Sequence, residues 1–267
     1  MNAGRIRAVV LKDWAELAQE RALIATSIGV PLLLVALYLA FALYAPHMND
    51  LELPAVDRPT VGELAPLFDE ALGQAARAQI FLLRQMLLML LVIPELATMA
   101  IATYSVIGEK RARSLEPLLA TPITTVELLA AKSLVAGIPG IGISWVVFGV
   151  VAAVLAAFLP PAALRSVFDP GTLLLVFVIA PLIALLGLSL GVIASARTSD
   201  PRTAQQIGVV VILPLMAMLV LQLEGLVWLT PGRILAGALA LLVVDVLVLL
   251  IGVRIFRRET ILTRWKS

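Results

Sequence analysis

The hydrophobic positions along this chain fall into long continuous runs instead of short alternating ones. Six windows of mainly apolar residues stand out, at 23–45, 80–107, 133–159, 172–196, 206–229 and 234–253. A helix needs about 20 such residues to cross the hydrocarbon core of a bilayer. Strands of a membrane barrel would alternate apolar and polar positions, so continuous runs favour helices. The pattern therefore predicts an all-α membrane protein, with residues 1–267 forming one domain of six transmembrane helices.

The basic residues fix the orientation that we expect for these helices. Fifteen Lys and Arg residues lie in one alternate set of connecting segments, which includes both ends of the chain, and five lie in the other set. Cytoplasmic segments of membrane proteins carry the excess of Lys and Arg. The asymmetry predicts that both termini are cytoplasmic, in a multi-pass protein of the cell inner or plasma membrane.

Composition narrows the classes of function. The chain is 61% hydrophobic and 14% charged, whereas about a quarter of the residues in an average soluble domain are charged. Its basic residues form no dense tract, so we expect the lipid bilayer and not nucleic acid as a partner. There is no cysteine, and His47 is the only histidine. We therefore predict no metal site and no histidine-based catalytic dyad.

Two segments outside the predicted spans have helical patterns. Residues 1–22 carry one apolar stripe, interrupted by Asp13 and Glu20, which predicts a helix lying along the cytoplasmic interface. The stripe comprises Ile6, Val9, Val10, Trp14 and Leu17. In the external segment 46–79, Thr60 and Glu63 form a capping box ahead of a second amphipathic helix. That helix is expected either to shield the helix ends or to act as a lid.

The cytoplasmic segment 108–132 has the most informative local chemistry. Ser114 is a good N-cap, and Glu116 and Pro117 both suit a first helical turn. Pro122 pushes the residue before it out of helical geometry. The segment therefore predicts a short helix from about 114 to 120, and one face of that helix carries Leu115, Leu118 and Leu119.

The run from Glu109 to Thr124 resembles the cytoplasmic signature of ABC transporter permeases, in the superfamily that includes drug, polysaccharide and lipid exporters. The similarity extends to 199–206 and 256–259, and so covers the chain in outline. It implies that the segment contains a coupling helix docking on an ATPase subunit, formed by Glu109, Arg113, Ser114, Leu115, Glu116, Leu118, Leu119 and Pro122. The alternative is an ordinary positive-inside loop that only fixes topology.

The resemblance also implies what must come from elsewhere. A phosphate-binding loop needs Gly-x4-Gly-Lys-Ser/Thr, and the single Lys-Ser pair, Lys132-Ser133, has no glycine just upstream. We therefore expect no catalytic residue and no cofactor in this chain, so that it is not an enzyme. ATP and Mg²⁺ would be bound by separate cytoplasmic ABC ATPase subunits. A second permease copy or a homologous permease would complete the assembly.

Two acids lie inside the predicted spans. Glu95 follows Pro94 in the second span, and Asp245 lies near the middle of the sixth. Charges at this depth are costly and normally face the bundle interior, so both are candidate pathway residues, with structural polar contacts as the alternative. They also support a second function, an ion- or proton-coupled secondary transporter. Pro94 further predicts a kink that frees the carbonyl near Leu90.

Overall fold

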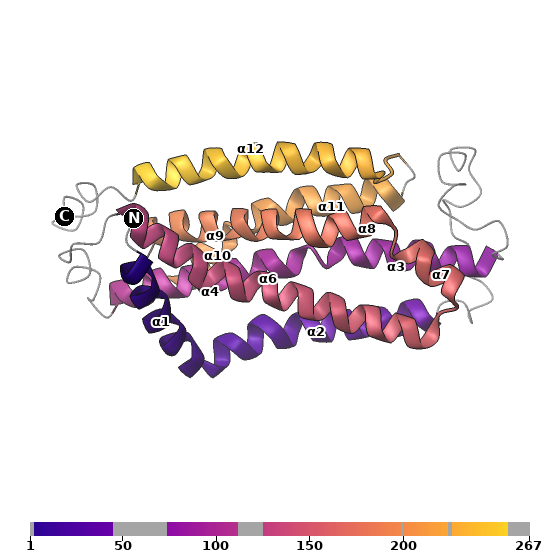
Figure 1. Ribbon diagram of the computed structural model, residues 1–267, viewed down its shortest axis with the longest axis horizontal. Helices are drawn as coiled ribbons and strands as arrows, with labels where there is room; N and C mark the ends of the chain where they lie inside the picture. The colour runs from indigo at the N-terminus through magenta and orange to yellow at the C-terminus, as the bar shows by residue number, and fades with distance from the viewer. Residues whose placement is uncertain (1–2, 45–73, 112–124, 199, 224–225, 256–267) are drawn as a thin grey trace.

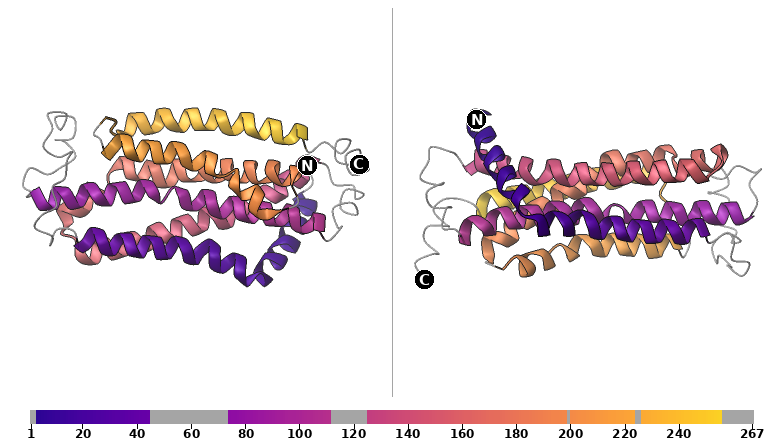
Figure 2. Two further views of the ribbon diagram at one scale, coloured as in Figure 1. Left: turned by 180° about the vertical axis from the view of Figure 1, so that it is seen from behind. Right: turned by 90° about the horizontal axis from the view of Figure 1, so that it is seen from below.

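The computed structural model describes residues 3–44, 74–111, 125–198, 200–223 and 226–255. Over these residues the chain is helical and contains no strand, which confirms the predicted all-α class. The long helices run side by side along one axis, with α2 (Arg21–Tyr44) and α12 (Pro231–Ile255) at opposite sides of the bundle (Figure 1). The first helix, α1 (Ala3–Gln19), turns sharply away from α2 at one end (Figure 2).

The remaining elements follow in chain order, several of them as interrupted spans. They are α3 (Gln74–Met89), α4 (Val92–Arg111), α6 (Thr125–Phe158), α7 (Pro161–Val167), α8 (Pro170–Leu174), the π-helix η4 (Leu175–Ile179), α9 (Ala180–Arg197), α10 (Pro201–Gln206) and α11 (Val209–Leu223). The predicted external helix lies in 45–73 and the predicted coupling helix in 112–124, both outside the described residues.

Five stretches of the described residues are long and apolar enough to cross a membrane. They are Gln79–Arg111, Ala130–Phe158, Pro170–Ser195, Pro201–Leu223 and Pro231–Gly252. The first predicted span coincides with the 24-residue helix α2, which includes the apolar stretch Pro31–Ala40. Six spans with both termini inside stay a prediction.

The helices of the fifth predicted span begin and end earlier than the apolar window suggested. Asp200 caps α10 by accepting a hydrogen bond from the amide of Thr203 at 3.1 Å, and Pro201 occupies the first turn. At the other end α11 stops at Leu223. The cap residue Asp200 and the first-turn proline therefore start α10 before the apolar window begins at residue 206.

The predicted kink at Pro94 is confirmed as a break between α3 and α4. Leu90 and Leu91 form a turn between the two helices. The carbonyl of Leu90 accepts a hydrogen bond from the amide of Ile93 at 3.1 Å. A tightened turn therefore satisfies this carbonyl.

Close helix packing at glycines holds α4 in the centre of the bundle, between α6 and α9. A Cβ atom added at Gly187 of α9 would lie 2.9 Å from the Glu95 carbonyl oxygen and 3.0 Å from Thr98 Oγ1. A Cβ at Gly191 would lie 3.2 Å from Ala102 Cβ. Small residues let the two backbones approach, as expected for membrane helices.

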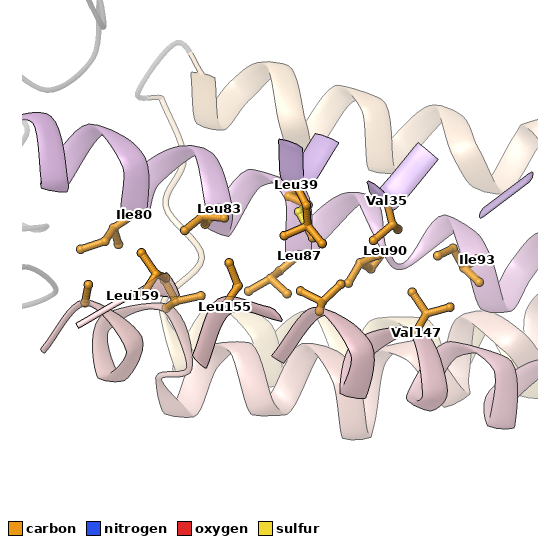
Figure 3. Packing of buried hydrophobic residues seen from close by; sticks show 14 residues of the cluster. Val35, Leu39, Ile80, Leu83, Leu87, Leu90, Ile93, Val147, Leu155 and Leu159 are labelled. Carbon is orange, nitrogen blue, oxygen red and sulfur yellow. The ribbon is translucent and has the colours of Figure 1, made fainter. Parts of the chain in front are cut away.

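At the end of the bundle away from α1, an apolar cluster joins α2, α3, α6 and α7. Leu83, Leu87 and Leu155 are almost completely buried within it, and Val35 and Leu39 reach it from α2 (Figure 3). Leu32 and Tyr38 pack at its edge, and the Tyr38 hydroxyl donates a hydrogen bond to the Leu82 carbonyl at 3.2 Å. These contacts place α2 against the broken α3–α4 pair.

Candidate functional site

The N-terminal helix α1 packs its predicted stripe onto the bundle. Val9, Val10 and Leu17 are buried against residues of α4 and α6. The Trp14 indole donates a hydrogen bond to the carbonyl of Val135 at 3.3 Å. Asp13 interrupts the apolar stripe in the sequence, yet it is only 2% exposed. A buried carboxylate at that position requires a cationic partner.

That partner is Lys132, on the second turn of α6. Its ammonium lies 2.7 Å from Asp13 Oδ2 and 2.9 Å from Glu109 Oε1 of α4. It also donates to Ser105 Oγ at 2.7 Å, and Ser105 in turn donates to Asp13 Oδ2 at 3.0 Å. The side chains of Lys132, Asp13 and Glu109 are 4%, 3% and 3% exposed. One buried ammonium thus joins three helices.

Lys12 completes this arrangement from the solvent side. Its Nζ lies 3.2 Å from Glu109 Oε1, 3.4 Å from Glu16 Oε1 and 3.6 Å from Asp13 Oδ1, and its side chain is 41% exposed. Burial alone would lower the pKa of Lys12, but the carboxylates of Glu109 and Asp13 outweigh it and raise that pKa. We call Lys12, Asp13, Ser105, Glu109 and Lys132 the charge cluster. Its two ammonium groups face two carboxylates, as a buried ion network requires.

The charge cluster lies at the base of the segment that the sequence singles out. Glu109 is two residues from the end of α4 at Arg111, and Lys132 lies seven residues after the start of α6 at Thr125. Residues 112–124 join these two ends. The Glu109–Lys132 ion pair therefore ties the two helices together where the segment leaves and re-enters the bundle.

The next residue, Lys110, ties the same end of α4 to the connection between α9 and α10. Its ammonium donates hydrogen bonds to the carbonyls of Ser195 and Thr198, the latter at 3.3 Å, where α9 ends. A cation at this position complements the negative end of the helix dipole. Just beyond, hydrogen bonds from Thr203 lower the pKa of Asp200, which keeps the cap of α10 ionised. The ends of α4, α6 and α9 are thus linked by polar contacts.

Of the eight residues predicted to engage an ATPase, the structure describes only Glu109. Its carboxylate is buried within the charge cluster, so its contacts in this chain are with Lys12 and Lys132. The other seven lie in 112–124, outside the described residues: Arg113, Ser114, Leu115, Glu116, Leu118, Leu119 and Pro122.

Sequence reasoning did not find the roles of Asp13, Ser105 and Lys132. One signal was present, because an aspartate within the apolar face of a helix must be paired when that face is buried. The partner could not be read from the sequence, since Lys132 lies 119 residues away. Among the described residues no group of three or more His, Cys, Asp or Glu is placed to hold a metal ion.

The two intramembrane acids lie deep in the bundle. Glu95 and Asp245 are both 0% exposed, and none of their four carboxylate oxygens has a hydrogen-bond partner among the described residues. Glu95 faces Gly208, where an added Cβ would lie 2.5 Å from its Oε1. The expectation that these acids face the bundle interior is confirmed. Whether they line a path stays a prediction.

Asp245 lies on α12, and Glu95 lies on α4. Cβ atoms built at Gly171 of α8 and Gly252 of α12 would lie 3.3 Å from Ile234 and 3.6 Å from Ile193, so α12 runs parallel to α8 and α9. The Glu95 backbone packs against Gly187 of α9. The two buried acids thus lie on helices that both pack against α9.

Comparison with known proteins gives one match. A family model described as "ABC-2 family transporter protein" matches residues 7–233, which includes the whole charge cluster and the 112–124 segment. The searches of curated proteins and of solved structures return no match.

Proposed function

This chain belongs to the ABC-2 family of transporter proteins and is a multi-pass membrane permease of an ABC transporter, and we propose that it is an exporter subunit driven by a separate cytoplasmic ATPase. Residues 112–124 would contain the helix that docks on the ATPase. The proposed topology has six spans with both termini in the cytoplasm, and α2 forms the first of them. ATP and Mg²⁺ would be bound by the partner subunit, and a second permease would complete the transporter.

The observation that carries this proposal is the charge cluster at the two ends of the 112–124 segment. Glu109 and Lys132 are joined at 2.9 Å, and both are held to α1 through Lys12 and Asp13. A loop that served only to fix topology would need basic residues but no buried anchor. The Glu109–Lys132 ion pair holds α4 and α6 together, so a force applied to residues 112–124 would move the two helices as one unit.

Force on α4 would then reach the membrane interior through its packing. At Gly187 and Gly191, α4 and α9 are closely packed, because backbone and short side chains of the two helices are in direct contact. A displacement of α4 would therefore carry along both Glu95, which lies on α4, and α9. The helix α12, which bears Asp245, also packs against α9. We propose these acids as pathway residues whose surroundings change during the transport cycle.

The test uses this chain co-expressed with the ABC ATPase encoded beside it and reconstituted in vesicles. The double variant Leu118→Glu/Leu119→Glu is expected to abolish both co-purification of the ATPase and permease-stimulated ATP hydrolysis. Its matched control, Leu118→Met/Leu119→Met, keeps the face apolar and should retain both. Normal ATPase recruitment by the Glu variant would overturn the docking proposal.

The two buried acids favour one alternative, a carrier driven by an ion or proton gradient. The same vesicles separate it from the leading proposal. Transport that persists without any ATPase, and follows an imposed pH gradient, would replace the ATP-driven function with this one. Transport that stops when the ATPase is omitted would remove the alternative.

A further inference from the structure

A small cavity lies at the end of the bundle opposite the charge cluster, and it is independent of the proposed docking segment. Its volume is about 50 Å³, and its walls come from α3, α8 with its N-cap, η4, the end of α11, the connection after it and α12. Roughly 10–15 Å³ is enough for one water-sized group, so the cavity admits a few non-hydrogen atoms. In the proposed topology this is the external end.

Two polar atoms in the cavity wall lack partners among the described residues. Gln85, from α3, is 2% exposed, and its Oε1 accepts no hydrogen bond. The buried Nε1 of Trp228 donates none. Both residues line the cavity. Buried polar groups in native proteins are almost always paired, so one free acceptor and one free donor at a single cavity indicate a bound group that supplies both complements.

The backbone of Trp228 is fixed by hydrogen bonds, and its indole packs on a neighbouring ring. The Trp228 carbonyl accepts hydrogen bonds from Arg233 Nη1 at 3.0 Å and from the amide of Thr230 at 3.1 Å. Phe81 packs edge-on against the indole with ring centroids 5.9 Å apart. Leucines and Ile234 give the cavity further apolar wall, suited to the C–H groups of a ligand, and Gln222 and Thr172 add polar side chains.

The charges at the cavity disfavour an ionic ligand. Arg84 and Asp169 both line it, but they form an ion pair with each other, and their side chains are 19% and 15% exposed. Burial would raise the pKa of Asp169, yet the hydrogen bond and charge of Arg84, with the Thr172 amide, lower it overall. The pair is therefore fully ionised and internally neutralised at neutral pH. A charged ligand would have to break it.

We propose that this cavity is a binding site for the hydroxyl group of a neutral polyol. The hydroxyl donates its proton to Gln85 Oε1, its oxygen accepts from Trp228 Nε1, and the adjoining carbon packs on Phe81. A hydroxyl suits both orphan atoms because it is a donor and an acceptor at once. Water has the same chemistry but would leave Phe81 and the leucines of the wall without an apolar partner.

The experiment follows the Trp228 indole N–H by ¹⁵N NMR of the full chain in lipid nanodiscs free of glycoside detergent. The signal is assigned by Trp228→Phe, and the probe is glycerol. A saturable shift of the Trp228 resonance is expected. The response to 1,2-dimethoxyethane should be much weaker, because its oxygens can accept from the indole but it has no donor for Gln85 Oε1. Gln85→Leu should weaken the response at least tenfold, and Gln85→Met gives the same test should the first variant misfold. Gln205→Leu, at an exposed position on α10, is the control and should respond normally.

Two results would overturn the proposal. An indole that exchanges with water but shows no saturable response to glycerol would mean that the cavity holds water alone. An unchanged glycerol response in both Gln85 variants would mean that the two orphan atoms do not share a ligand. Neither result bears on ATPase docking, which is measured at the other end of the molecule.

Discussion

Removing the Lys132 ammonium should destabilise the protein far more than removing that of Lys12, although both contact the same carboxylates. Lys132 is 4% exposed and lies within 3 Å of Asp13 and Glu109, so Lys132→Gln leaves two buried carboxylates without their principal cation. Breaking a buried ion pair from one side costs about 3–5 kcal/mol. Lys12 is 41% exposed, and Lys12→Gln should cost at most about 1 kcal/mol.

Thermal unfolding of the detergent-purified protein measures this difference. For a chain of this size about 1 kcal/mol lowers Tm by roughly 2–4 °C, so Lys132→Gln should lower Tm by on the order of 10 °C. A double-mutant cycle with Asp13→Asn should show a coupling energy above about 1 kcal/mol, because the two groups are in direct contact. Equal and small shifts for the two lysine variants, or additive effects in the cycle, would refute a buried network that anchors α1 to α4 and α6.

Three further predictions concern the bundle itself. Gly187→Ala should destabilise by about 1–3 kcal/mol in thermal unfolding, because its Cβ would meet the Glu95 carbonyl at 2.9 Å, whereas Gly149→Ala, which has nothing within 4 Å, should be neutral or stabilising. Because the folded-state pKa of Asp169 is lowered, its pairing with Arg84 stabilises above the ordinary carboxyl pKa of about 4 and is lost as pH falls below it. The cost of Arg84→Gln, about 1.5–3 kcal/mol at pH 7, should therefore shrink towards pH 3, and a pH-independent cost would contradict the pairing. Glu95→Gln should change the rate of vesicle transport or its pH dependence, and an unchanged profile would leave Glu95 with a packing role only.

The helical class of the fold could be predicted from the sequence because only helices and closed barrels satisfy all backbone hydrogen bonds in lipid. A run such as 172–196 must be helical once it is too long and too apolar for a soluble strand, and the structure has a span at Pro170–Ser195. The break near Pro94 was predictable for the same local reason, since proline removes one helical donor. Boundaries such as that at Pro201 depend on caps and were placed less well.

The charge cluster could not be predicted, because its members are far apart in the sequence. Asp13 and Lys132 meet only after α1 folds back onto α6, and each taken alone resembles an ordinary interfacial charge. The same holds for the cavity at the opposite end of the bundle, where Gln85 and Trp228 come together from α3 and the connection before α12. Periodicity reports which face of a helix is buried, but it does not report which other helix covers that face.

The most direct test of the account is the location of residues 114–120, and the absence of cysteine from the chain makes it a clean one. A single Leu118→Cys variant in sealed vesicles of known orientation is exposed to a membrane-impermeant maleimide from each side in turn. Labelling from the cytoplasmic side alone, with protection when the ATPase is bound, is the expected result. Labelling from the external side would contradict both the topology and the docking of this segment on an ATPase.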